Sequence, residues 1–556
     1  METAPVLVVG AGPVGMVAAL ALARYGIRCM LIDQQTETTR HPKLDYVSTR
    51  SMELLRPLGI TDDIRAAGVA PEHPADVVWS TGLTGAPIAV WRLPSVDEER
   101  RRIAERNDGT QPVEPGQRIS QVTLEPVLRA HCRRHPRIDL SCGWKLESLT
   151  QDRDGVTSDL VDVRTGRRRQ VRSSYLIGCD GASSQVRRTV GIGLDGFDVP
   201  ELPGAFMVHF KSRDLSTLHR HGQFWHYFAF RYVIIAQDEI DTWTVHVNGA
   251  DPAEFDPPPP DPAGFVREVT QVDLEIDKVL LASRWRPSFL LAQRYRAGRV
   301  LLAGDSAHQM FPTGGYGMNS GIADAVDAAW KLAALLTGFG GAALLDSYER
   351  ERRPVGLNNM HASRRHLGVH LKAGQMLREG VPPETVGAFI DAERGENEYA
   401  GVELGYRYDE SPIVSHDEGP EPYWSPQQYT PTTWPGGRPP SVRLRDGRQL
   451  YDLLGQWFTL VDFAGDGRAD PLLRECAAQG LPVMQVLVSD PAAGRLWERA
   501  LVLVRPDQHV AWRGDWSPPD PAAVVRRVRG ALTPATTAPA ASPTAPRTND
   551  RKGIPR

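Results

Sequence analysis

The sequence has few cysteines and lacks the spacings that bind metals. Its 556 residues include five cysteines, which stand far apart and form no Cys-x-x-Cys pair. So small, odd and scattered a set is typical of reduced, buried thiols in a cytoplasmic protein rather than of a disulfide framework. No cluster of His, Cys, Asp or Glu has a usable metal-ligand spacing. We therefore expect no metal and a cytoplasmic location.

Long runs of one charge or of uninterrupted apolar residues are also missing. The formal net charge is −4, the isoelectric point is about 6.4, and no Lys/Arg-rich stretch occurs. Nucleic acid is therefore not an expected partner. Residues 5–26 are apolar enough for a signal or membrane segment, but glycines and a proline interrupt them, and the acidic Glu2 precedes them. We expect neither secretion nor membrane insertion.

The same N-terminal stretch has the order strand, glycine turn, helix, strand, acid. An apolar run over residues 6–9 leads into GAGPVG, and a helical pattern and a second apolar run end at Asp33. In this setting GxGxxG predicts dinucleotide binding, because glycines let backbone approach a pyrophosphate and a helix N-terminus supplies N–H groups. Asp33 would accept hydrogen bonds from a ribose; a βαβ unit without nucleotide is the alternative. The expected binding residues are Gly10, Gly12, Pro13, Val14, Gly15 and Asp33.

The remaining chain divides by texture, and its length exceeds what one hydrophobic core supports. Residues 76–93 and 204–247 alternate as strands do, and short buried strands are expected over 176–178 and 300–303. Residues 322–336 and 345–380 are helical in pattern. Beyond about residue 405, a Pro/Gly-rich passage precedes a compact αβ pattern and a Pro/Ala/Thr-rich tail.

Three separated motifs carry a family resemblance. They are GAGPVG at 10–15, YLIGCDGASSQVRR at 175–188 and GDSAHQMFPTGGYGMNSGIADA at 304–325. In this order the chain resembles single-component FAD-dependent aromatic hydroxylases of the para-hydroxybenzoate hydroxylase family, especially phenol-, dichlorophenol- and polyketide-type members, over residues 4–530. The resemblance implies an α/β fold with a Rossmann-like (GR2-type) FAD-binding domain, an inserted β-sheet substrate domain and a C-terminal thioredoxin-like α/β domain, here without Cys-x-x-Cys.

The resemblance also implies domain bounds. The FAD-binding domain is expected to be discontinuous, over residues 1–75, 100–190 and 284–405. The substrate-binding sheet takes 76–99 and 191–283, the thioredoxin-like domain takes 406–532, and a disordered tail takes 533–556.

By the same resemblance, the third motif holds the flavin. Asp305 would hydrogen-bond the ribityl chain, although a turn-capping Asp is the alternative. The glycines let backbone approach the flavin ring, and the N–H groups that begin the following helix point at the flavin edge where negative charge gathers on reduction. His308 is interpreted as structural rather than catalytic. The further cofactor contacts implied are Lys43, Gln121, Asp180, Pro312, Gly317, Met318 and Asn319.

Asp45 is the candidate catalytic residue. It stands five positions before Arg50, where phenol hydroxylases resemble this sequence by carrying a base beside the substrate hydroxyl. A carboxylate that takes the phenol proton makes the ring carbons more electron-rich. A turn Asp bonded to its own backbone is the alternative. Lys43 stands where many relatives have Arg, which weakens the case for a bidentate contact there.

The substrate wall is expected from GQFWHYFAFRYVII, residues 222–235. Strand alternation would place Trp225, Tyr227 and Arg231 on one face, and the opposite face would carry Phe224, His226, Phe228 and Tyr232. Pro312 and Gly314 would complete the wall. Which face points inward stays open, and rings that pack a sheet core are the alternative for each residue.

The function implied is hydroxylation of a phenolic or related aromatic compound by FAD, NADH or NADPH, and O₂ through a C4a-hydroperoxyflavin. A Baeyer–Villiger oxygenase or epoxidase shares this chemistry and stays open, as does a non-catalytic flavin- or ligand-binding protein. A halogenase is disfavoured because no WxWxIP stretch occurs. The expected partners are a small aromatic substrate and O₂, and a homo-oligomer is compatible with the apolar helices.

Overall fold

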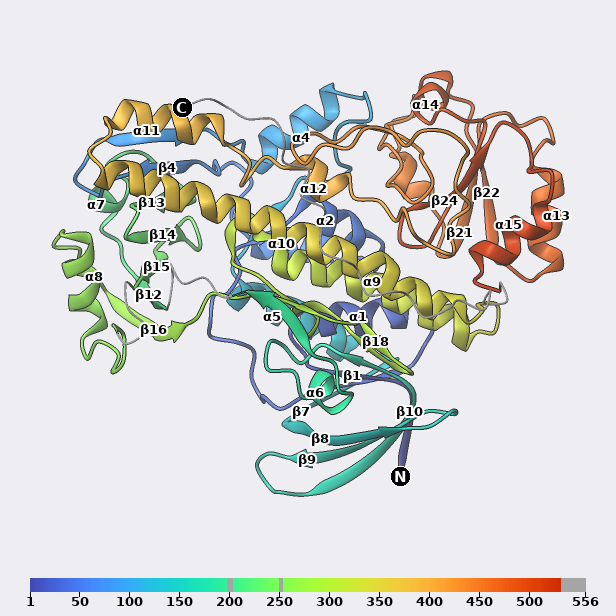
Figure 1. The fold of residues 1–556 in the computed structure, drawn as a ribbon, viewed down its shortest axis with the longest axis horizontal. Helices are drawn as coiled ribbons and strands as arrows, with labels where there is room; N and C mark the ends of the chain where they lie inside the picture. The colour runs from blue at the N-terminus through green and yellow to red at the C-terminus, as the bar shows by residue number, and fades with distance from the viewer. Residues whose placement is uncertain (198–203, 250–253, 532–556) are drawn as a thin grey trace, which may run out of the picture.

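The computed structural model describes residues 1–197, 204–249 and 254–531 (Figure 1). The expected tail over 533–556 lies outside the described residues. The fold is the expected mixed α/β architecture, with a first sheet that has a parallel centre, a second sheet and a C-terminal α/β unit. The domain bounds stay predictions.

The first sheet has a parallel centre in the order β19-β10-β1-β2-β7. Val6 pairs with Cys29 on one side and with Tyr175 on the other. The central strands are continuous apolar runs because both of their faces are covered. An antiparallel pair extends β10 to form the lobe that carries β8 and β9 in Figure 1. The strands are β1 (Glu2–Val9), β2 (Cys29–Asp33), β7 (Ile138–Cys142), β8 (Trp144–Gln151), β9 (Val156–Asp162), β10 (Arg168–Gly178), β18 (Arg296–Ala297) and β19 (Val300–Leu302).

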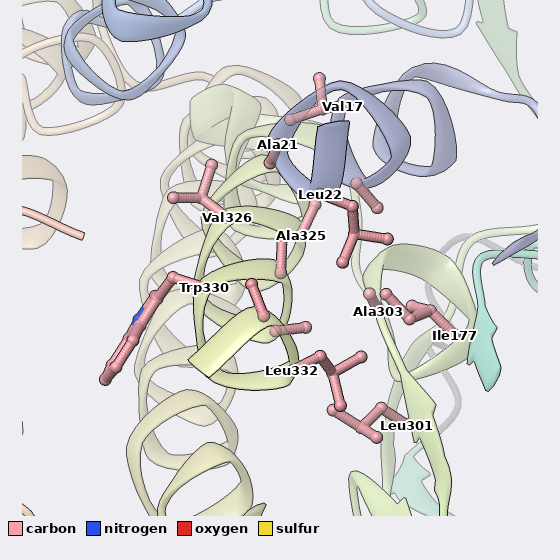
Figure 2. Close-up of a cluster of buried hydrophobic side chains, with 14 of the residues drawn as sticks. Val17, Ala21, Leu22, Ile177, Leu301, Ala303, Ala325, Val326, Trp330 and Leu332 are labelled. Atoms are coloured by element: carbon pink, nitrogen blue, oxygen red, sulfur yellow. The ribbon is translucent and has the colours of Figure 1, made fainter. Parts of the chain in front are cut away.

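Helices cover this sheet, and α1 packs against α9 at its centre. Figure 2 shows fully buried side chains of α1, α9, β10 and β19 filling the space between them, among them Leu22, Leu332 and Ile177. This packing fixes both glycine-rich helix starts relative to the sheet. The helices of this part are α1 (Pro13–Arg24), α2 (Thr49–Leu55), α3 (Thr61–Ala67), α4 (Val96–Glu105), α5 (Gln121–Arg134), α6 (Gln185–Thr189), α9 (Tyr316–Leu336) and α10 (Ala343–Arg378), with the 3₁₀ turns η1 (Arg56–Leu58), η2 (Gly304–Ser306) and η3 (Thr313–Gly315).

The second sheet has the order β16-β12-β15-β14-β13-β4-β5 and is antiparallel except for the β13–β4 pair. One face, with Tyr227 and Ile234, packs in a core with α8. The other face, with Phe228, packs against α10 and α11. The elements are β4 (Val77–Ser80), β5 (Pro87–Trp91), β12 (Ala205–Lys211), β13 (His226–Phe228), β14 (Tyr232–Ala236), β15 (Thr242–Asn248), β16 (Lys278–Trp285), α7 (Leu215–Leu218), α8 (Pro262–Thr270) and α11 (Pro383–Ala392).

Two small sheets join these parts. The pair β3–β6 lies beside the site, and β11-β17-β20 links the segment after β10 to the third motif. Their strands are β3 (Tyr46–Val47), β6 (Gln117–Arg118), β11 (Leu194–Phe197), β17 (Phe289–Ala292) and β20 (His308–Gln309).

The C-terminal unit is a sheet in the order β22-β21-β23-β24, drawn orange to red in Figure 1. Leu460 packs with α13 and α15 on one face, whereas Val461 packs with Trp497 on the other. Its elements, with the preceding α12, are α12 (Ala400–Leu404), η4 (Leu450–Leu453), β21 (Phe458–Asp462), α13 (Asp470–Ala478), β22 (Val483–Leu487), α14 (Pro491–Leu496), β23 (Leu501–Val504), β24 (Val510–Gly514) and α15 (Pro521–Val528).

Candidate functional site

The turn between β1 and α1 forms a cradle with one open side. Gly10 has φ +102°, and a Cβ there would stand 2.3 Å from the Cys179 carbonyl oxygen. At Gly15 a Cβ would stand 1.8 Å from the Gly10 oxygen, so that glycine is required for packing. At Gly12 a Cβ would meet no protein atom within 4 Å, and this residue lines a cavity of about 1050 Å³. The turn therefore keeps free room beside bare backbone.

Asp33 ends β2 at the rim of the same cavity. Its Oδ2 accepts a hydrogen bond from the Ala11 backbone N–H at 2.6 Å, and Oδ1 accepts one from the Gln35 N–H at 2.7 Å. The carboxylate thus fixes the glycine turn, and its remaining lone pairs are available to ribose hydroxyls.

Asp305 lies in η2 and lines the same cavity of about 1050 Å³, which is the larger of two cavities in the site. Burial raises the pKa of Asp305, and the charges of His308 and Lys43 oppose the rise. Among the described residues no hydrogen-bond donor contacts this carboxylate. It is therefore free to accept from the hydroxyls of a bound group.

A buried ionic group holds η2 in place. His308 Nε2 lies 2.9 Å from Asp324 Oδ2, which also accepts from the Gly304 N–H at 3.1 Å. Arg352 Nε donates to Asp324 Oδ1 at 2.8 Å. His308 is 1% exposed and does not line either main cavity, so its role is to fix the turn that carries Asp305.

The start of α9 presents backbone to the cavity. Gly314 and Gly315 have φ +81° and +64°, which turns the chain sharply after Pro312. A Cβ at Gly317 would meet no protein atom within 4 Å, and Gly317 and Met318 line the larger cavity. The N–H groups of a helix start carry partial positive charge, so this end suits an electron-rich ring edge.

Asn319 instead joins α9 to its neighbours. Its Oδ1 accepts from the Ser48 N–H at 2.9 Å and from Ser51 Oγ at 2.7 Å. Its Nδ2 donates to the Gly315 oxygen at 2.7 Å and to the Tyr46 oxygen at 3.2 Å. The side chain therefore braces the loop around the helix start.

The remaining expected cofactor residues lie around the larger cavity. Gln121 begins α5 and donates from Nε2 to Glu125 Oε1 at 2.8 Å. Asp180 accepts from the Val186 N–H at 3.0 Å, which orders the short α6. Lys43 is exposed at the rim. Those of the expected cofactor residues that line this cavity are Gly10, Gly12, Pro13, Val14, Asp33, Lys43, Gln121, Asp180, Asp305, Pro312, Gly317 and Met318.

A second cavity, of about 360 Å³, adjoins the first. Asp45, Tyr46, Pro312 and Gly315 line both, so these residues mark the place where the two cavities meet. The smaller cavity continues along Gly314 and Trp225 toward α12. A group bound in the larger cavity would therefore reach a second molecule in the smaller one beside Asp45.

One oxygen of Asp45 is fully engaged. Its Oδ2 accepts from Trp225 Nε1 at 3.0 Å and from His226 Nε2 at 2.8 Å, whereas Oδ1 accepts no hydrogen bond from the described residues. Burial acts to raise the Asp45 pKa, but the contacts of His226 and Trp225 and the charge of Arg118 outweigh it and hold the pKa below its usual value. Asp45 is an ionised acceptor with 21% of its side chain exposed.

Strand alternation predicts Trp225 and His226 on opposite faces, but in the structure both side chains reach the site. The strand β13 begins only at His226, so Trp225 and His226 both contact Asp45, and both line the smaller cavity. Tyr227 is 1% exposed in the second core, where its Oη donates to the Gly82 oxygen at 3.0 Å. Arg231 lies exposed in the β13–β14 turn. The structure brings neither Tyr227 nor Arg231 to the cavities.

Sequence reasoning did not single out two residues of the smaller cavity. Arg118 is 8% exposed, and its guanidinium lies 5.6 Å above the Trp225 ring. The Oη of Tyr316 lies 3.0 Å from Nε2 of His366. Arg118 belongs to no recognisable motif, and Tyr316 stands in the third motif without a role that the motif itself indicates. Partners from distant segments define the surroundings of both residues.

The chain fits a bound FAD on these observations. The cavity beside Gly12 and Gly317 is lined by backbone that would admit a Cβ, and the Asp305 carboxylate has no protein donor among the described residues. The βαβ turn would hold the pyrophosphate, Asp33 and Asp305 would hold hydroxyls, and the α9 start would face the ring.

Comparisons with known proteins agree with this geometry. The family described as "FAD binding domain" matches residues 3–363, and "Aromatic-ring hydroxylase, C-terminal" matches residues 432–535. The chain is 40% identical to the FAD-dependent monooxygenase apdD of Emericella nidulans, over 92% of this chain and 87% of that one. It is 32% identical to 4-methyl-5-nitrocatechol 5-monooxygenase of Burkholderia sp., over 94% and 96%.

A solved structure is similar over nearly the whole chain. The flavin-dependent monooxygenase PieE, in complex with FAD and substrate, superposes with a TM-score of 0.84 at 31% identity, covering 95% of this chain and 99% of that one. In this chain, none of the helices within the described ranges combines the length and apolar character needed to cross a bilayer.

Proposed function

This chain belongs to the FAD-dependent aromatic and polyketide monooxygenases, and we propose that it hydroxylates a phenolic ring of a multi-ring compound. FAD is its cofactor, and NAD(P)H is the reductant typical of the family. The overall reaction consumes one O₂ and one NAD(P)H with a proton, and yields the hydroxylated ring, NAD(P)⁺ and water.

The observation that carries the proposal is the position of Asp45. Asp45 lines both cavities, and its Oδ1 accepts no hydrogen bond from the described residues, so this oxygen would be available to a hydroxyl of a ring held in the smaller cavity. A ketone has no such proton to release. This favours a phenolic substrate over a Baeyer–Villiger substrate.

The chain's own steps are binding, proton transfer and exclusion of water. The substrate O–H donates to Asp45 Oδ1, and transfer of the proton leaves a phenolate whose ortho and para carbons are electron-rich. Asp45 keeps that proton during hydroxylation and then returns it to the phenolate oxygen of the product. Bound FAD would supply hydride acceptance from the nicotinamide and the activation of O₂.

The smaller cavity supports a substrate with more than one ring. It extends from Asp45 past Tyr316 to Tyr399 and Tyr406. Tyr316 and Tyr399 belong to one apolar cluster, which offers ring faces for stacking. The nitrocatechol substrate in one relative's name is itself a phenol, which agrees with this class.

The test is oxidation of NADH and of NADPH by the FAD-loaded protein with a panel of one-ring and multi-ring phenols. Oxygen uptake and product mass are recorded together. We expect a multi-ring phenol to accelerate oxidation and to gain one oxygen atom with all rings intact. Oxygen insertion into a ketone without any response to phenols would instead establish the Baeyer–Villiger reaction.

A further inference from the structure

We propose that His226 and Trp225 act as positioning residues that clamp Oδ2 of Asp45, leaving Oδ1 as its single substrate-binding oxygen. The inference rests on the proposed function and assigns roles to two side chains of the same site. Both donors converge on one oxygen, at 2.8 Å from His226 Nε2 and 3.0 Å from Trp225 Nε1.

The clamp is built from adjacent residues and stacked rings. The rings of Trp225 and His226 lie 4.4 Å apart at 28°, and the Trp225 ring also contacts Tyr46 at 5.3 Å. Trp225 is 5% exposed, directly precedes β13, and donates its indole N–H to Asp45. This stacking fixes both donors and thereby fixes the plane of the carboxylate.

The second nitrogen of His226 supports the same assignment. Nδ1 is buried and has no hydrogen-bond partner in the described structure. The imidazole therefore has one polar contact that fixes its orientation, and that contact is Asp45. Nε2 must carry a hydrogen to donate to an ionised carboxylate, which makes the ring a donor and leaves the substrate proton to Oδ1.

Arg118 adds charge to this arrangement. It is buried, and among the residues that the structure describes its Nη atoms donate only to the carbonyl oxygens of Pro74 and Ala236, at 3.0 and 3.2 Å. Its Nε has no partner among the described residues. The guanidinium above the Trp225 ring is thus a fixed cation behind the N–H that points at Asp45.

The other titratable groups facing the pair are His246 from β15 and Glu396 from the segment between α11 and α12. Burial lowers the His246 pKa to about 4, so this ring is neutral above pH 5. Burial acts to raise the Glu396 pKa, but the charge and hydrogen bond of His370 and the charge of His226 lower it overall. Both groups keep one charge state between pH 5 and 8.

The test is the pH dependence of 2-naphthol binding to the oxidised FAD-loaded protein, followed by the flavin absorption spectrum between pH 4.5 and 8. The naphthol hydroxyl stays protonated over this range, so the acid limb reports on Asp45. For wild type we expect nearly constant affinity. His226→Leu removes a donor and leaves burial to raise the Asp45 pKa, which shifts the acid limb upward by at least about one pH unit.

Three further variants separate the clamp from a packing role. His226→Gln retains an N–H near the Nε2 position and is expected to restore the wild-type curve. Trp225→Phe keeps a ring but loses the N–H, and a smaller upward shift is expected. His131→Leu removes a histidine from another Asp–His pair, 2.7 Å from the exposed Asp63, and is the matched control.

Curves for His226→Leu and Trp225→Phe that coincide with wild type would overturn the clamp while leaving the proposed function intact. A His226→Gln curve as displaced as that of His226→Leu would also overturn the donor role. If wild type itself fails to bind 2-naphthol anywhere in the range, both the phenolic site and the clamp are wrong.

Discussion

The partly buried Asp45 and a buried group of three acids differ in how many of their carboxylate oxygens accept hydrogen bonds. At the cavity junction, Asp45 has one engaged and one unengaged oxygen. Between α9, α10 and the C-terminal sheet, Asp327, Glu351 and Asp507 lie with their ligand atoms within 4.8 Å of one another. Every oxygen of these three carboxylates contacts a donor.

The donors of the second group are mostly cationic. Arg505 contacts all three acids, with Nη1 at 2.7 Å from Glu351 Oε1 and Nη2 at 2.6 Å from Asp507 Oδ2. Lys331 Nζ lies 2.6 Å from Asp327 Oδ2 and also contacts Glu351. Since Lys331 and Arg505 occupy the space between the acids, this group fastens the C-terminal unit to the helices.

The comparison indicates what separates a structural carboxylate from one proposed to react with substrate in the same fold. Both kinds of carboxylate have perturbed pKa values. Every oxygen of the structural acids contacts a donor, whereas Asp45, which lines both cavities, keeps one oxygen without a donor among the described residues. An oxygen without a donor is therefore a better indicator of function here than a perturbed pKa.

The largest expected effect comes from removing a donor from the group of three buried acids. Arg505→Met leaves three acids facing one lysine, and we expect the free energy of unfolding of the FAD-loaded protein to fall by about 3–5 kcal/mol. Urea unfolding measures it. The matched control is Arg468→Met, whose ion pair with Asp466 at 2.6 Å is at the surface. A loss for Arg505→Met no larger than that of the control would contradict the structural role.

The next effect tests Asp45, the carboxylate with one oxygen free of donors among the described residues. Asp45→Asn keeps the side-chain shape but cannot take a proton, so we expect kcat/KM for phenol hydroxylation to fall about 100-fold while hydrogen peroxide release rises. Unfolding should change little, because only Oδ2 has protein partners. Asp62→Asn, at an exposed acid on α3 that lines neither cavity, is the control. Unchanged product formation per NAD(P)H in Asp45→Asn would show that Asp45 is not the base.

The smallest effect is a pH dependence of stability. Burial raises the pKa of Asp327 in the folded protein to about 7, above its unfolded value. The folded state then binds more protons between about pH 4 and 7, so the stability contributed by this group falls as pH rises through that window. We expect wild type to lose about 2–3 kcal/mol relative to Asp327→Asn between pH 4.5 and 7.5. Parallel curves for the two proteins would refute the raised pKa.

The parts of the site that follow from local sequence were predictable. The β1–α1 turn needs small residues at fixed positions, and so does the start of α9, because backbone must approach other backbone or a ligand there. The αβ pattern after residue 450 also agrees with β21 to α15, since each strand is a short apolar run between polar turns.

The contacts of Asp45 were not predictable from one sequence. His226 lies 181 positions away, and its orientation depends on where β13 begins. Period-two alternation assumes a regular strand, so it grouped Trp225 with Tyr227 and Arg231, which the irregular entry to β13 separates. Arg118 was missed because its surroundings come from residues distant in sequence, namely Trp225 and the carbonyl groups that accept from its guanidinium.

The long helix α10 contacts three regions of the molecule and links their unfolding. Its 36 residues span about 54 Å at 1.5 Å per residue, and it crosses the whole view in Figure 1. Glu351 meets the C-terminal unit at one end, Ser363 accepts from Thr313 beside the α9 start, and His370 lies against Trp79 of the second sheet. A single rod thus couples three regions, so they can be expected to melt in one cooperative transition.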